Sequence, residues 1–217
     1  MTVTRPTHLG LAVATLALLS FGTVPASAYQ RTMTCGTDTT GECKKGEKAK
    51  PLWWPVHCLT YRINERGTDQ FPRTKDGEIG GQLRDLVKRG FRAWSNPDCS
   101  ELQIESRGLT PNDRVRYRQC KGWQENENVV VWRDDGWPHT STATIALTSV
   151  HYDPDDGRIL DADIEFNTSF YDFTNLDEPG EKNKIDFLNT HTHEVGHFVG
   201  LDHPGDHPEA TMHAQAR

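Results

Sequence analysis

The chain has 217 residues, of which 25% are charged and 35% hydrophobic, and its formal net charge is −7 at pH 7. This acidic balance argues against nucleic acid as a main partner, because nucleic-acid-binding surfaces need an excess of Lys and Arg. Even without a short leader, the length is enough for one domain with a substantial core.

Residues 1–28 have the pattern of a secretory signal peptide. Arg5 and His8 precede an apolar run at 9–19, and Ala26-Ser27-Ala28 fits the small-residue cleavage pattern. A buried helix is the alternative reading of this apolar run. The run is short for a membrane span, and no later segment is long enough. We therefore expect a secreted, extracellular protein with no stable membrane association after signal cleavage.

Five cysteines follow the signal: Cys35, Cys43, Cys58, Cys99 and Cys120. Export makes disulfide bonds plausible, and the odd count leaves one thiol unpaired or bonded to another chain. A Cys58–Cys99 bond would join a predicted strand to the end of the next helix, and a Cys35–Cys43 bond would close a small loop. Cys120 is then left over, although the sequence does not fix the connectivity.

Residues 29–55 form a polar, cysteine-containing segment that is rich in Thr, Gly and Lys and is typical of loop structure. It could be a short propeptide, a disulfide-tied brace or a spacer. Residues 56–217 are expected to form one α+β domain. A helix is predicted at 78–94 from its apolar spacing, ending before Asn96-Pro97. Strands are predicted at 59–64, 102–105, 128–133, 143–152 and 159–167, the third of them buried on both faces.

The most informative stretch lies at 193–203. On an α-helix, residues four apart are separated by about 40° around the axis, so His193 and His197 can share one metal ion. Glu194 is rotated by a further ~100° and lies beside the metal. Gly200 can end the helix and bring His203 from a loop as a third ligand. Three protein nitrogens leave a fourth position for water, which is the arrangement of a catalytic zinc site.

The residues around the motif agree with a helix that has one buried face. An apolar stripe at helical spacing should pack on the core while the histidine pair faces a cleft. His191 lies nearly opposite His193 and is interpreted as a packing or surface residue. A chance cluster of surface histidines is the alternative, but Gly200 and His203 at the required positions make that far rarer. The expected stripe consists of Ile185, Leu188, Thr192, Val195 and Val199.

The pattern H-E-x-x-H-x-x-G-x-x-H is that of the metzincin zinc metalloproteases. The chain resembles their matrixin branch, in particular the secreted bacterial matrixin-family peptidases. The segment Ile-Leu-Asp-Ala-Asp-Ile-Glu-Phe-Asn at 159–167, the strand at 143–152 and the order of elements extend the likeness over roughly 56–213. The resemblance implies a twisted mixed sheet above an active-site cleft, with the zinc helix beneath. It also implies that Met212 forms a methionine turn, a platform under the histidines.

Peptide substrates of this family lie antiparallel to an edge strand of the cleft. The resemblance places that edge near 143–148, with Ala146 and Leu147 as substrate-binding residues, although the stretch could equally be an interior strand. Two departures stand out. Pro204 follows the third ligand, where matrix metalloproteases usually have Ser. The sequence ends five residues after Met212, so the C-terminal wall of the specificity pocket is expected to be short or missing.

These residues predict a secreted zinc metalloendopeptidase, a hydrolase of protein or peptide substrates. His193, His197 and His203 would hold one Zn²⁺ and a zinc-bound water. Glu194 would take the proton of that water as general base and pass it to the leaving amine. Activity should fall in acid as the ligand histidines become protonated.

Two other functions stay open from the sequence. One is a catalytically impaired, zinc-binding secreted domain, and the other is a hydrolase of small amides, which would need a deep closed pocket. A second cofactor is a further option. Asp153, Asp155 and Asp156 form an oxygen-rich turn that could bind Ca²⁺, although a solvated acidic turn is the commoner explanation.

Overall fold

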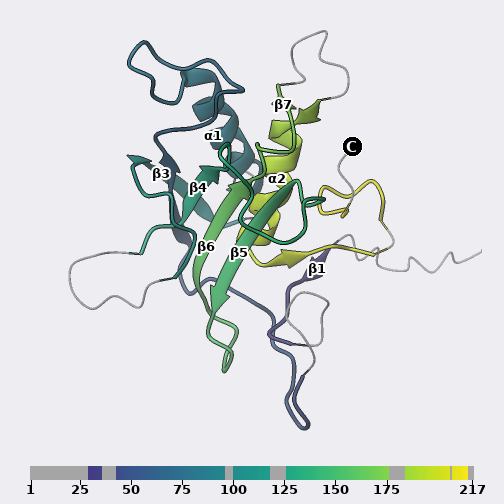
Figure 1. Cartoon of the computed structure of the whole chain (residues 1–217). Helices are drawn as coiled ribbons and strands as arrows, with labels where there is room; N and C mark the ends of the chain where they lie inside the picture. Colours follow the sequence, from purple (N-terminus) through teal and green to yellow (C-terminus); the bar gives the residue numbers. More distant parts are fainter. Residues whose placement is uncertain are drawn as a thin grey trace, which may run out of the picture.

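The computed structural model describes residues 29–35, 43–95, 100–117, 126–175, 184–205 and 207–214, and the predicted signal lies outside them. No helix within these ranges is long and apolar enough to span a membrane. Figure 1 shows the arrangement of the elements. In chain order they are β1 (Gln30–Arg31), β2 (Cys58–Asn64), α1 (Gly81–Ser95), β3 (Gln103–Thr110), β4 (Val129–Trp132), β5 (Ala146–Tyr152), β6 (Ile159–Phe166), β7 (Phe173–Thr174), β8 (Ile185–Asp186), α2 (Phe187–Phe198) and β9 (Leu201–Asp202).

A five-stranded mixed sheet forms the centre of the structure, with strand order β3-β2-β4-β6-β5. The first four of these strands are parallel to their neighbours, and β5 is antiparallel to β6. The central strand β4 is buried along its whole length, as its run of valines predicts. Two helices and a mixed sheet are compatible with the predicted α+β class, and β5 lies at an edge of the sheet.

Both helices cover one face of the sheet, and their apolar side chains join alternate residues of the strands in one core (Figure 1). Leu83, Val87 and Phe91 provide the buried side of α1. This helix begins at Gly81, later than predicted, because the backbone of Ile79 forms a bridge with Arg73 instead. Local apolar spacing favours helix at 78–80, but the tertiary backbone pairing prevails there.

The buried stripe of α2 differs from the predicted one. Phe187, His191, Val195 and Phe198 are at most 1% exposed, whereas Leu188, Thr192 and Val199 are only partly buried and Ile185 lies in β8 before the helix. The buried stripe is shifted because the imidazole of His191 occupies a core position.

The His191 ring is a neutral packing residue. It is stacked among aromatic rings, and its Nε2 donates to the Val87 carbonyl at 3.0 Å. Gly90 of α1 permits this approach, since a Cβ there would lie 2.3 Å from the His191 ring. Burial lowers the pKa of His191 to about 4.

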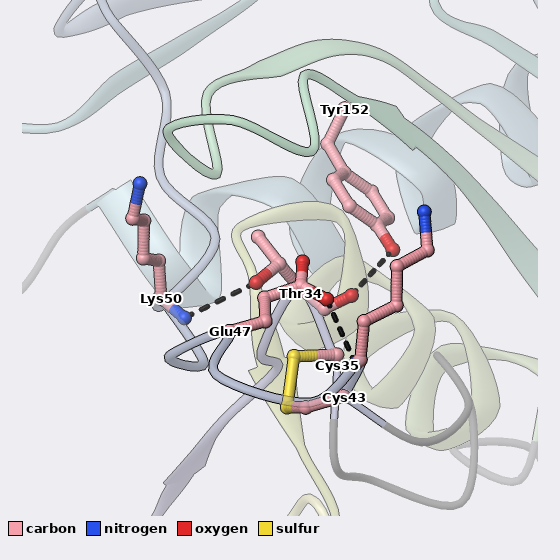
Figure 2. Close-up of a disulfide and its surroundings, with 7 residues drawn as sticks. Thr34, Cys35, Cys43, Glu47, Lys50 and Tyr152 are labelled. Atoms are coloured by element: carbon pink, nitrogen blue, oxygen red, sulfur yellow. Dashed lines mark hydrogen bonds between the residues drawn. A yellow bond between two sulfur atoms is a disulfide. The ribbon is translucent and has the colours of Figure 1, made fainter.

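A disulfide joins Cys35 and Cys43 in the N-terminal segment (Figure 2), one of the two pairings that the sequence suggested. Cys58, at the start of β2, is an exposed free thiol. The predicted Cys58–Cys99 bond is therefore not formed at Cys58, while Cys99 itself and the remaining Cys120 lie outside the described residues.

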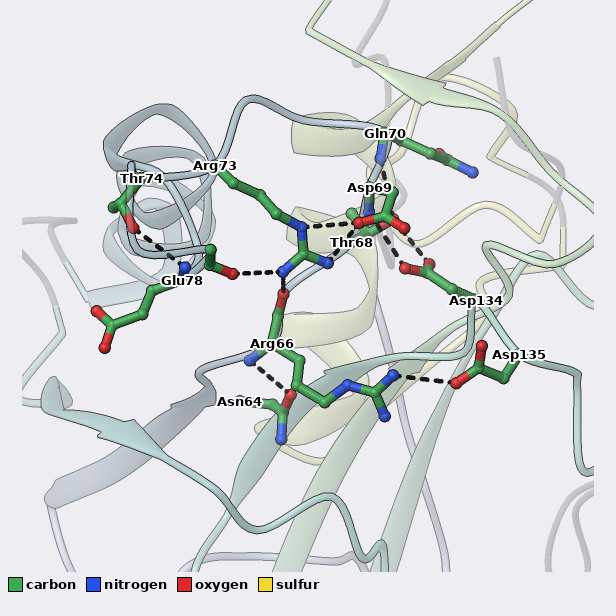
Figure 3. Close-up of polar contacts among 11 residues, drawn as sticks. Asn64, Arg66, Thr68, Asp69, Gln70, Arg73, Thr74, Glu78, Asp134 and Asp135 are labelled. Carbon is green, nitrogen blue, oxygen red and sulfur yellow. Dashed lines mark hydrogen bonds and ion pairs between the residues drawn. The ribbon is translucent and has the colours of Figure 1, made fainter.

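A polar network connects the loop after β2 with the end of β4 (Figure 3). The Thr68 hydroxyl donates to Asp134 at 2.8 Å, and the Arg66 guanidinium pairs with Asp135 at 3.0 Å. These contacts fix the start of the connection that runs from β4 to β5. The backbone that leads from β4 toward the edge strand β5 is therefore anchored to the loop after β2.

The face of β6 opposite the helices carries three buried carboxyl groups, on Asp161, Asp163 and Glu165. Arg133 pairs with Glu165 at 2.7 Å, and the Val129 amide donates to Asp163 at 2.8 Å. Asp161 and Asp163 each retain one buried oxygen without a hydrogen-bond partner among the described residues. Burial, reinforced by the neighbouring charge of Asp161, raises the pKa of Asp163 to about 8.

Replacing Asp163 with Asn should stabilise the protein at alkaline pH. The folded-state pKa lies above the unfolded one, so the contribution of the neutral carboxyl is present in acid and is lost as the pH rises toward 8. We expect Asp163→Asn to exceed wild type in free energy of unfolding by about 1–2 kcal/mol at pH 8, and to match it near pH 4. Urea melts at both pH values measure this. The exposed Asp85→Asn change on α1 is the control, and identical pH dependence in all three proteins would contradict the prediction.

Candidate metal centre

Capping residues at both ends set the length of α2. At the N-terminus, the Asp186 carboxylate accepts the Asn189 amide hydrogen at 3.0 Å. At the C-terminus, Gly200 adopts φ +91°, a left-handed conformation that ends the helix and that favours glycine. A side chain at Gly200 would also meet the Leu52 carbonyl at 3.0 Å. The chain turns back here into β9, which leads to His203.

The three predicted ligand residues meet at one point. Nε2 of His203 lies 3.1 Å from Nε2 of His193 and 3.1 Å from Nε2 of His197. Tetrahedral zinc with Zn–N bonds of about 2.0–2.1 Å places its nitrogens about 3.3 Å apart. Within the described ranges this is the only group of three or more His, Cys, Asp or Glu residues whose ligand atoms converge.

Backbone carbonyls determine which imidazole nitrogens face the centre. Nδ1 of His193 lies 2.8 Å from the Thr211 carbonyl, and Nδ1 of His197 lies 2.8 Å from the Leu201 carbonyl. A carbonyl oxygen only accepts, so each Nδ1 carries the hydrogen and each Nε2 presents a lone pair. Nε2 of His203 can donate a hydrogen to one of these lone pairs but not to both. A cation satisfies all of them together.

The electrostatic environment keeps the three rings in the neutral form that binds metal. Burial is the main cause that lowers the pKa of His193, of His197 and of His203. Three imidazoles suit a borderline transition ion such as zinc and fit poorly with Ca²⁺ or Mg²⁺, which prefer oxygen. The donor set therefore fits the expected class of ion without selecting one member.

Met212 lies beneath the histidine pair and is 3% exposed. A Cβ built on Gly196, which lies between the two helical histidines, would come within 2.0 Å of the Met212 sulfur. Trp94 of α1 borders the same position, at 3.0 Å, and its indole donates to the Thr192 carbonyl at 2.7 Å. The close packing of Met212 on α2 fixes Thr211, whose carbonyl holds His193.

Glu194 is buried where α2 faces the edge strand, and Thr148 is its side chain's one hydroxyl partner among the described residues. Oγ1 of Thr148 lies 2.6 Å from the Glu194 carboxylate and 3.0 Å from the Glu194 carbonyl. Burial raises the pKa of Glu194, and the hydrogen bond from Thr148 opposes that rise. Sequence reasoning missed Thr148, because a threonine in a strand carries no sign of the helix residue that it contacts.

A cavity of about 750 Å³ lies between β5 and α2 and opens onto the ligand histidines. Ala146 and Leu147, the predicted substrate-binding residues, both line it, together with Glu194 and Thr148. Among the described strands β5 pairs only with β6, so its other edge is available to a further strand. The structure thus places the edge strand, the carboxylate and the three imidazoles around one space.

In the acidic turn predicted as a possible calcium site, the Asp153 and Asp156 carboxylates bind groups of the turn itself. The Asp153 carboxylate accepts the Asp155 amide hydrogen at 2.9 Å and lies 3.3 Å from the Arg158 guanidinium. The Asp156 carboxylate accepts the Arg158 amide hydrogen at 2.8 Å. In the part of the chain that the structure describes, these carboxylates do not converge as a metal-binding group. Hydrogen bonds within the turn explain these residues.

No protein-family model matches the chain, and no curated protein matches it.

Replacing Gly196 with Ala should weaken metal binding. The added methyl group overlaps the Met212 sulfur, so Met212 and Thr211 must shift, and the Thr211 carbonyl then holds His193 less well. We expect Zn²⁺ affinity to fall about tenfold, measured by competition with a chelating dye. Gly205→Ala is the matched control, because a Cβ there meets nothing within 4 Å. Equal affinities for the two variants would show that Met212 does not support the centre.

Proposed function

We propose that the protein is a secreted zinc-dependent endopeptidase of the metzincin type, similar to the matrixins. The observation that carries this proposal is the convergence of three Nε2 atoms beside a buried carboxylate and a cavity. The sequence supplies the metzincin spacing at 193–203 and the signal-like leader. The mixed sheet above a helix that carries the histidines is compatible with this family.

His193, His197 and His203 would hold the ion through Nε2, next to the cavity that these residues line. A divalent zinc ion in such a site lowers the pKa of water and polarises a carbonyl group. The Thr211 and Leu201 carbonyls keep the His193 and His197 rings in the required tautomer and orientation.

Glu194 would act as the proton carrier. Its carboxylate takes a proton from the water that attacks the peptide carbonyl and then delivers it to the departing nitrogen. A carboxylate whose pKa is raised by burial is a stronger base than an exposed one, and its protonated form can return the proton to the leaving nitrogen. Thr148 holds one oxygen of this carboxylate, so it is a positioning residue.

The free edge of β5 favours a peptide over a small amide as substrate. A peptide in extended conformation can form main-chain hydrogen bonds with an exposed strand edge while its side chains occupy pockets. Ala146 and Leu147 lie on this strand in the cavity wall, so the scissile bond of such a peptide would lie next to Glu194. A small amide would use the catalytic groups but not the strand edge.

Replacing Glu194 with Ala should preserve metal binding and remove most of the peptidase activity. We expect kcat on casein or peptide libraries to fall about 10²- to 10⁴-fold, since a general base contributes that much. A chelator should abolish wild-type activity, and His203→Ala should lose the metal as well as the activity. Normal cleavage by Glu194→Ala would exclude Glu194 as the base. Tight zinc binding by wild type without any cleavage would instead favour the catalytically impaired domain.

Replacing Thr148 with Val should move the acid limb of the pH–rate profile to higher pH. The lost hydrogen bond normally lowers the pKa of Glu194, so this pKa rises in the variant and the base form is lost sooner on acidification. We expect kcat/KM near neutral pH to fall about tenfold and the loss to shrink as the pH rises. Thr148→Ser keeps a hydroxyl and should restore the wild-type profile. An acid limb shared by all three proteins would contradict this role.

A further inference from the structure

The N-terminal segment runs alongside the turn that carries the third ligand. Residues 29–35 and 43–54, which we call the N-terminal brace, contain β1, and β1 pairs antiparallel with β9. In this pairing Gln30 lies opposite Asp202, and Arg31 lies opposite Leu201. The chain reaches His203 directly after β9, so the brace forms the last regular backbone pairing before the third ligand.

Thr32 makes two contacts to this turn. Its amide donates to the Gly200 carbonyl at 3.0 Å, and its hydroxyl donates to the Leu201 carbonyl at 3.0 Å. The same Leu201 oxygen accepts the hydrogen of Nδ1 from His197. One carbonyl thus uses both of its lone pairs, one for Thr32 and the other for a ligand imidazole.

The rest of the brace holds Thr32 in place. The Leu52 amide donates to the Thr32 carbonyl at 2.8 Å, and the Thr34 amide donates to the Lys50 carbonyl at 2.8 Å. The Cys35–Cys43 disulfide lies at the end of these two paired stretches. The two stretches therefore form a closed unit.

Two further contacts anchor the closed unit to the domain. Tyr152 at the end of β5 donates from its hydroxyl to the Thr34 carbonyl at 3.1 Å, and the Trp54 indole donates to the Phe198 carbonyl at 2.8 Å. The first contact fixes the brace to the edge strand, and the second fixes it to the end of α2. The brace therefore spans the two elements that border the cavity.

Most of the brace lies outside the main core. The buried apolar cluster that joins the sheet to both helices begins at Leu59, and none of its fully buried members comes from the brace, although the partly buried Trp54 packs against it. Changes at Thr32, Cys35 or Cys43 can therefore alter the metal centre while the main core is retained.

We propose that the disulfide-closed brace positions the ligands His197 and His203, with Thr32 as the positioning residue and the Cys35–Cys43 bond as the element that keeps it in register. The inference rests on the metal site of the proposed function. On this proposal, the three histidines reach their full affinity for Zn²⁺ only in an oxidising compartment, where the Cys35–Cys43 disulfide forms.

The test compares two identical substitutions within the brace, in the full chain with its disulfide formed. Thr32→Val removes the hydroxyl that contacts Leu201, whereas Thr34→Val removes a hydroxyl that accepts the Lys50 amide at 3.1 Å and does not contact β9. We expect Zn²⁺ affinity to fall about tenfold or more for Thr32→Val and less than twofold for Thr34→Val. The double variant Cys35→Ser/Cys43→Ser should lose about tenfold.

A second measurement does not require the metal. Hydrogen–deuterium exchange of the peptide covering residues 199–205 in the metal-free protein should accelerate in Thr32→Val and in the double serine variant, while the α1 amides remain protected. Thr32→Ser retains a hydroxyl and should restore both affinity and protection, which guards against a folding defect in the valine variant.

Unchanged zinc affinity and unchanged exchange in Thr32→Val, or in the double serine variant, would overturn the proposal. A different result would contradict the peptidase assignment. If the wild-type protein binds zinc without cleaving peptides, the proposed function is wrong, but the differences in exchange and in zinc affinity would still support the positioning role of the brace.

Discussion

Three imidazole Nε2 atoms that converge on one point are all satisfied together only by a cation between them, and contacts from the surrounding structure hold the rings in this arrangement. The Nε2 atoms lie 3.1 Å apart in two of the pairs. Carbonyl oxygens from two separate segments hold two of the rings through Nδ1. A polar cluster of this kind is stable only when all its members are satisfied, and contacts made outside the three histidines hold them in a geometry that could bind a metal.

Helix α2 connects the centre with the core because its two sides carry different imidazoles. His191 is enclosed by aromatic rings and remains neutral, with its pKa lowered by burial. His193 and His197 lie on the side that borders the cavity. Gly90 and Gly196 permit the close packing of α1 and of Met212 against this helix. The position of the ligands is therefore fixed by the same packing that stabilises the fold.

The sequence predicted those parts of the structure that depend on local spacing. The ligand positions follow from helical geometry and one left-handed glycine, and the buried β4 follows from its valines. The shift of the buried stripe toward His191 was missed, because a histidine is not counted as a core residue. Thr148 and the Thr211 and Leu201 carbonyls were missed for another reason. Backbone acceptors and single hydroxyls leave no periodic signal, and the partners of Thr148 and Thr211 also lie far away in the chain.

The polar N-terminal segment pairs with the turn that leads to His203. Helical geometry fixes His193 and His197 relative to each other, but His203 follows a glycine turn, and each residue ordered outside a helix costs roughly 1–2 kcal/mol of conformational entropy. Local sequence offers little to offset this cost, apart from the Asp202 carboxylate that accepts the His203 amide hydrogen at 2.8 Å. Backbone pairing between β1 and β9 supplies hydrogen bonds that offset the entropy cost of ordering this turn. A segment without the apolar pattern of a core element can thus help to position the candidate metal centre through backbone pairing and one hydroxyl group.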